Sequence, residues 1–206
     1  MNKNLFMDRI FNEGLTYHNY IQQLESILSS IRTDDLTCTQ LDEFNGKKLN
    51  YQRITRIYKN YVVNEQLHDR INEINSPQIW MVLSEDWCGD SAQNLPYLAR
   101  IAECNSIIEF KILFRDVNLD IMNRYLTDGN KSIPKLIVFD IDWNELFQWG
   151  PRPKEAQELV AKSKSEGKSK EQFLTDLHLW YSRNKGKNLE EEIFSLLKKE
   201  NFIAHN

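Results

Sequence analysis

The feature that most constrains the fold is a change of hydrophobic period at Ser76-Pro77. From there to residue 163, short apolar runs alternate with amphipathic runs whose apolar positions recur every three or four residues. Strand-like runs cover 78–84, 107–116, 135–141 and 145–149, and helix-like runs cover 91–104, 119–127 and 154–163. The order β-α-β-α-β-β-α predicts an α/β domain, a sheet with helices on both faces.

Helical sequence precedes this unit. Residues 1–75 contain two apolar stripes at helical spacing, near 17–31 and 49–74. Between them lies a polar, turn-rich segment that ends at Asn45-Gly46. We interpret residues 1–75 as a helical hairpin rather than a separate catalytic domain.

Helical sequence also follows the unit. A lysine-rich segment comes after residue 163, and two amphipathic runs near 170–184 and 188–199 predict helices that pack back on the N-terminal hairpin. The predicted organisation is an N-terminal helical extension, an α/β domain and a C-terminal helical extension, with bounds 1–75, 76–163 and 164–206.

Charge and hydropathy exclude several classes of function. The chain has 26 Lys and Arg against 30 Asp and Glu, a net charge of -4, so it offers no basic field for nucleic acid. No run approaches the roughly 20 apolar residues that span a bilayer, and charges interrupt the first turns where a signal peptide would need an apolar core. We therefore expect a cytoplasmic protein with no membrane association and with reduced cysteines, of which there are three.

The peptide most indicative of chemistry surrounds Cys88, at the junction of the first predicted strand and the first helix. A cysteine at a helix N-terminus meets unpaired backbone N–H groups and the positive end of the macrodipole, which favour the thiolate. The carboxylates of Glu85, Asp86 and Asp90 oppose the thiolate by like charge. The net direction of the pKa shift stays open at this point.

Two motifs resemble the thioredoxin family. Trp87-Cys88-Gly89-Asp90-Ser91 is similar to the family's Trp-Cys-Gly-Pro-Cys site, and Ser132-Ile133-Pro134 opens the third strand as the family's cis-proline motif does. The resemblance covers roughly residues 76–163 and is greatest to bacterial thioredoxin-like proteins with an N-terminal helical extension. It implies a thioredoxin-like fold with a four-stranded mixed sheet and added N- and C-terminal helices.

The resemblance also assigns site residues. It implies Cys88 as the nucleophile, Ser91 at the position of the resolving cysteine, and an exposed indole at Trp87. Ile133 would offer backbone hydrogen bonds to an extended substrate chain. The complete set of implied groove residues is Trp87, Gly89, Asp90, Ile133, Pro134, Trp149 and Gly150. Strand alternation alone favours a core position for Trp149, as it does for most of the other aromatic residues.

The sequence departs from the family where disulfide chemistry needs a second thiol. Ser91 cannot form a disulfide, so dithiol turnover through this site is excluded. The family's buried acid, six residues before the nucleophile, is replaced by Val82. Cys104 would end about 20 Å from Cys88 along a helix, beyond the roughly 7 Å limit for a disulfide. Whether Cys38 approaches Cys88 stays open.

Three hypotheses of function follow. The first is a monothiol thiol–disulfide protein in which Cys88 forms mixed disulfides with protein or small-molecule thiols and disulfides. The second is a redox-inactive module that binds an extended protein segment in the groove. The third, an iron–sulfur site like that of the monothiol glutaredoxins, is disfavoured because Trp87 and Asp90 are not that family's residues. The sequence has neither metal-ligand spacing nor a phosphate-binding glycine loop, so we expect no metal and no cofactor.

Overall fold

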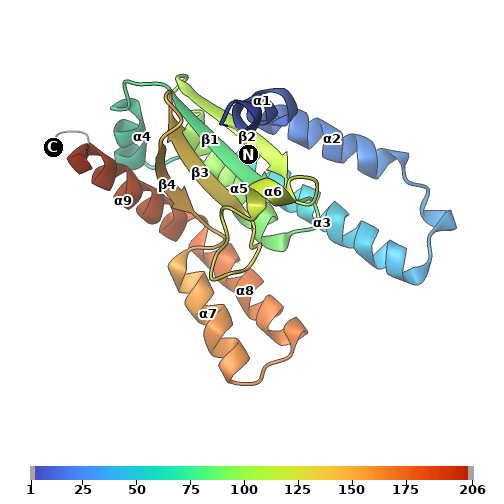
Figure 1. Cartoon of the computed structure of the whole chain (residues 1–206). Coiled ribbons are helices and arrows are strands. Elements are labelled where there is room, and N and C mark those ends of the chain that lie inside the picture. The colour runs from blue at the N-terminus through green and yellow to red at the C-terminus, as the bar shows by residue number, and fades with distance from the viewer. Residues whose placement is uncertain (1–2, 204–206) are drawn as a thin grey trace.

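The computed structural model describes residues 3–203 of the chain (Figure 1). Its centre is a four-stranded mixed sheet in the order β2-β1-β3-β4. β1 (Gln78–Ser84) pairs in parallel with β2 (Ile108–Phe114) and antiparallel with β3 (Lys135–Asp140), and β3 pairs antiparallel with β4 (Glu145–Trp149). The predicted α/β fold with a four-stranded mixed sheet is confirmed.

Helices surround this sheet on both faces. They are α1 (Lys3–Glu13), α2 (Tyr17–Ser30), α3 (Cys38–Asn60), α4 (Glu65–Asn72), α5 (Gly89–Ala102), α6 (Leu119–Met122), α7 (Lys154–Ser165), α8 (Lys170–Asn184) and α9 (Lys187–Ile203). The hairpin of α2 and α3 and the hairpin of α7 and α8 extend beyond the sheet in different directions (Figure 1).

The central strand β1 is buried along its whole length. Because side chains alternate across a strand, Trp80 and Val82 enter the core that α2, α3, α4, α5 and α9 share, whereas Met81 and Leu83 enter the core beneath α1 and α6. A strand covered on both faces needs apolar residues at successive positions. This requirement accounts for the unbroken apolar run that predicts β1.

The N-terminal prediction is wrong in one part. α3 begins at Cys38 and continues through Asn45-Gly46, where a turn was predicted. The Thr37 side chain accepts a hydrogen bond from the Gln40 backbone N–H, and the Gln40 side chain accepts one from the Thr37 N–H, so a capping box starts the helix well before the second apolar stripe. The exposed Gly46 lowers helix propensity, but it does not end the helix.

Two smaller differences concern the other predicted helices. α6 ends at Met122 rather than near residue 127, and a tight turn that pairs Thr127 with Asn130 follows it. Of the two C-terminal helices, α9 packs on α4 and on β4, whereas α8 packs on α7 rather than on the N-terminal hairpin.

The ends of the predicted extensions, residues 1–2 and 204–206, lie outside the described residues. Within the described residues, no helix combines the length and the apolarity required to span a bilayer.

Candidate active site

Cys88 is the N-cap residue of α5, at the end of the loop that follows β1. The antiparallel register of β1 and β3, with Leu83 opposite Lys135, brings the start of β3 beside this loop. The Cys88 thiol therefore lies against Ile133, and its Sγ donates a hydrogen bond of 3.4 Å to the Ile133 carbonyl oxygen. The Ile133–Pro134 peptide bond is cis. Sheet pairing thus brings together the two sequence motifs, which lie 45 residues apart.

Burial controls the ionisation of Cys88, of which only 8% is exposed. Desolvation raises the pKa of the thiol, and the negative charge of Asp90 raises it further. The neighbouring Ser91 side chain and the backbone N–H groups of Ser91 and Asp90 lower the same pKa, but they do not offset burial. The thiol is therefore protonated at neutral pH, consistent with its role as a donor to Ile133.

The Asp90 carboxylate is held by two side chains, those of Arg152 and Tyr181. Its Oδ2 lies 2.5 Å from Nη2 of Arg152, and its Oδ1 accepts a hydrogen bond of 2.9 Å from the Tyr181 hydroxyl. Asn94 donates a hydrogen bond of 3.0 Å to that hydroxyl. Burial, followed by the charge of Asp90, raises the pKa of Tyr181 well above its usual value, so the phenol stays neutral. Helix α8, which lies in the C-terminal part of the chain, therefore belongs to the surroundings of the candidate thiol.

Trp87 is 46% exposed beside the buried thiol. Its indole Nε1 donates a hydrogen bond of 3.3 Å to Asp116, and the Arg115 guanidinium lies 4.8 Å above its ring. Glu85, which is 7% exposed, accepts a hydrogen bond of 2.7 Å from the Asp116 backbone N–H, and burial raises the pKa of its carboxyl group. These contacts fix the loop on which Trp87 stands, and nearly half of the side chain remains exposed.

The remaining implied residues occupy different surroundings. Ser91 is fully buried, and its Oγ meets no partner with hydrogen-bond geometry among the described residues. Gly150 has φ +116°, and a Cβ there would stand 2.2 Å from the Pro134 carbonyl oxygen. This position requires glycine because the loop packs directly on the backbone beside Ile133. Gly89 lies close to α8, since a Cβ on it would stand 3.6 Å from His178.

Trp149 is packed in the core at the end of β4, and together with Gly150 it also lines a second cavity. Its indole is 5% exposed, and Nε1 donates a hydrogen bond of 2.6 Å to Glu192 on α9. Trp149 pairs with Leu136, and Phe147, two residues earlier, points to the same face of the sheet. Strand alternation therefore predicted the buried position of Trp149 correctly. The Glu192 carboxylate is a second partner that the sequence did not reveal.

Neither of the other two cysteines can resolve a disulfide formed at Cys88. α5 runs for 14 residues between Cys88 and the turn that holds Cys104, a rise of about 21 Å. Cys38 begins α3, and Asn50 on the same helix donates a hydrogen bond of 3.0 Å to the Asp86 carbonyl oxygen. Cys38 therefore lies roughly 18 Å further along the axis of α3. Among the described residues, no three His, Cys, Asp or Glu side chains gather as metal ligands would.

Comparisons with known proteins concern the family and the fold of the chain. A family model described as Thioredoxin matches residues 39–166, more than half of the chain. A protein of unknown function from Pseudomonas aeruginosa superimposes with a TM-score of 0.56 at 16% identity, over 81% of this chain and 89% of that chain. An HIV epitope-scaffold protein superimposes with a TM-score of 0.59 at 16% identity, over 93% and 96%. These two likenesses concern the fold alone, and no curated protein matches the sequence.

Proposed function

Because the chain belongs to the thioredoxin family of thiol–disulfide proteins, we propose that it is a monothiol member in which Cys88 forms mixed disulfides with protein or small-molecule partners. The observation that carries this proposal is the position of Cys88, at the N-terminus of α5 and against the Ile133 carbonyl, with a serine where a resolving cysteine would stand. Cys38 and Cys104 are too distant to replace that cysteine.

The reaction requires deprotonation before attack. Cys88 loses its proton to solvent, and its thiolate attacks one sulfur of a disulfide and releases the other as a thiolate. The Ser91 backbone N–H, 3.4 Å from Sγ, supports the anion. Since no thiol stands at position 91, an external thiol must attack the mixed disulfide, which regenerates Cys88 and carries the substrate away as a new disulfide.

The test uses a variant in which serine replaces both Cys38 and Cys104, so that Cys88 is the sole thiol. We expect oxidised glutathione to add one glutathionyl group to the folded protein at mildly alkaline pH, detected by intact mass, and reduced glutathione to remove it. The matched control is Cys88→Ser with Cys38 and Cys104 retained. If the sole-thiol variant reacts only after denaturation, Cys88 is inaccessible in the fold and the proposal is wrong.

The second candidate is a redox-inactive module that binds an extended protein segment. The observation in its favour is the burial of Cys88, which raises the pKa of the thiol and lowers the thiolate fraction. The exposed Trp87 ring, next to Cys88 in the sequence, would serve such a role equally well. Cys88→Ala separates the two candidates, because it abolishes thiol chemistry but leaves the retention of a bound peptide intact.

A further inference from the structure

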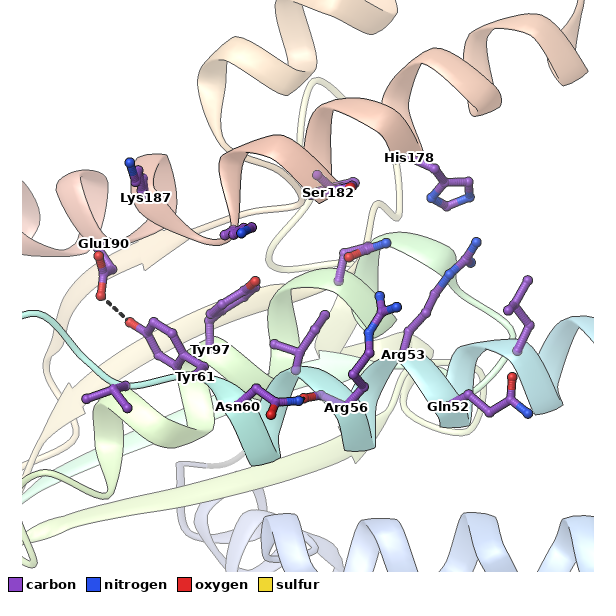
Figure 2. A pocket seen from close by; sticks show the side chains of 16 residues that line it. Gln52, Arg53, Arg56, Asn60, Tyr61, Tyr97, His178, Ser182, Lys187 and Glu190 are labelled. Atoms are coloured by element: carbon purple, nitrogen blue, oxygen red, sulfur yellow. Dashed lines mark hydrogen bonds between the residues drawn. The ribbon is translucent and has the colours of Figure 1, made fainter.

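A large cavity lies between α3 and α8, separate from the thiol. Its volume is about 1170 Å³, and its walls come from α3, α5, α8 and the start of α9. Figure 2 shows Arg53 and Arg56 extending from α3 into this space, with His178 on α8 facing Arg53. Tyr61 and Tyr97 lie at the other end. The space exceeds the 300–1,000 Å³ usual for small-molecule sites, so it has room for a nucleotide-sized ligand.

The charges that line the cavity are unbalanced. Arg53, Arg56, Lys185 and Lys187 face a single carboxylate, that of Glu190. This carboxylate is already engaged, because it accepts hydrogen bonds from the Tyr61 hydroxyl and from the Asn64 backbone N–H. The excess of positive charge is notable in a chain whose overall charge is -4.

The two arginines lack the carboxylate partners that such residues usually have. Arg53 donates only to the amide oxygen of Asn50, at 3.3 Å, and within the described part of the chain neither arginine forms an ion pair. They stand three residues apart on α3, where like charges repel. Burial, and then the charge of Arg56, lowers the pKa of Arg53. Burial, and then the charge of Arg53, likewise lowers the pKa of His178.

The far wall is held in a conformation that few side chains adopt. Lys185 has φ +52°, a left-handed backbone that residues with a Cβ rarely adopt. The next residue, Gly186, has φ +86°, and a Cβ on it would stand 2.6 Å from the Tyr97 ring. The junction between α8 and α9 is therefore packed tightly on Tyr97, and this packing fixes the position at which Lys185 and Lys187 border the cavity.

We propose that this cavity binds a small molecule that carries two or more phosphate groups, held by the guanidinium groups of Arg53 and Arg56. Guanidinium forks match the geometry of phosphate oxygens, and a multiply charged anion relieves the repulsion within the cluster. Lys185 and Lys187 supply further charge at the rim, and the tyrosine rings offer a surface for an organic group. The site does not depend on the chemistry of Cys88.

Calorimetric titration at low ionic strength tests this inference, with inorganic pyrophosphate and ATP as the probes. We expect both to bind to the full chain, and Arg56→Ala to weaken binding by about tenfold or more, as the loss of one charged hydrogen-bond pair does. Arg56→Lys keeps the charge but loses the fork, so it should give an intermediate affinity. A gain for ATP over pyrophosphate identifies the tyrosine wall as a subsite for the organic group.

The matched control is Arg183→Ala, which removes the same charge from an exposed position on α8 that does not line the cavity. An equal loss of affinity in the two alanine variants would mean non-specific attraction, and the proposal would be wrong. Failure of both probes to bind, or binding of citrate as tight as that of pyrophosphate, would also overturn the assignment to phosphate. Arg56 is exposed, and circular dichroism verifies that its variants remain folded.

Discussion

Replacing Asp90 with asparagine should make Cys88 more acidic and more reactive. Asp90 is the second cause, after burial, of the raised pKa of the thiol. Its carboxylate is paired with Arg152 at 2.5 Å, so the substitution removes a negative charge and also leaves the guanidinium without its counterion. Both changes favour the thiolate. The asparagine Oδ1 can still accept the hydrogen bond from Tyr181, which preserves the packing of α8.

The magnitude follows from the geometry. A charge a few Å from an ionisable group shifts its pKa by about 1–3 units, and we take the lower end because burial, rather than Asp90, is the main cause of the raised pKa of the thiol. A fall of about one unit gives about tenfold more thiolate at neutral pH. Each thiolate is then about threefold less nucleophilic, given a Brønsted coefficient of about 0.4–0.5. The net expectation is a rise of about threefold in the rate of disulfide exchange.

The assay follows the reaction of the sole-thiol variant with dithiodipyridine across pH, which yields both the pKa and the limiting rate. Arg152→Gln should shift the pKa in the opposite direction. Asp34→Asn makes the same change of charge at an exposed residue of the N-terminal extension and should leave both values unchanged. A Cys88 pKa that stays the same or rises in Asp90→Asn refutes the electrostatic reasoning, and another group must then set the reactivity of the thiol.

Two further predictions concern turnover and packing. The wild type should show little reduction of insulin disulfides. In the variant that has serine at positions 38 and 104, Ser91→Cys should raise this activity, because a second thiol supplies the intramolecular resolving step. Efficient insulin reduction by the same variant with Ser91 retained would contradict this prediction. Gly186→Ala should lower the free energy of unfolding by roughly 1–3 kcal/mol, since the new Cβ meets the Tyr97 ring at positive φ. Gly46→Ala, on the exposed surface of α3 with nothing within 4 Å, should instead raise it by about 0.5–1 kcal/mol. Urea denaturation measures both glycine variants, and equal shifts would disprove the steric argument.

The two central strands could be predicted because they are covered on both faces. The runs at 78–84 and 135–141 are apolar at successive positions, which a buried strand requires and a surface helix does not. The structure places β1 at Gln78–Ser84 and β3 at Lys135–Asp140. Strand bounds therefore follow the sequence within a residue or two wherever burial is complete.

The first half of α3 lacked this signal. Its N-terminal turns extend beyond the sheet, and between Cys38 and Asn50 only Phe44 and Asn50 itself are buried. A helix with so little buried surface shows weak apolar periodicity, and its polar residues resemble those of a loop. The capping box at Thr37 was the available signal, since a threonine followed three residues later by a glutamine favours the start of a helix.

The thiol and the opposing charge of Asp90 were predictable from local motifs, but the contact of Tyr181 with Asp90 was not. Cys88 and Ile133 were expected to meet because both belong to motifs with a fixed place in the fold. Tyr181 lies 91 residues from Asp90, on a helix that the sequence assigned only to a C-terminal extension. No local pattern encodes a contact between a helix end and a tyrosine on a remote helix. In the structure Tyr181 is buried one turn after Leu177 on α8, but this spacing alone does not say which group it contacts.

The contacts of Asp90 join parts of the chain that lie far apart in the sequence. Arg152 and Tyr181 both converge on Asp90, so a single carboxylate links the thiol loop, the loop after β4 and α8. The Trp-Cys-Gly-Pro-Cys site that this motif resembles has an uncharged proline at this position. Here the carboxylate opposes ionisation of Cys88 while it anchors a helix that borders the arginine-lined cavity. On the proposed monothiol function, we expect a thiol that burial and Asp90 keep protonated to react slowly until a partner displaces its hydrogen bond to Ile133, and we therefore expect selective exchange rather than general reductase activity.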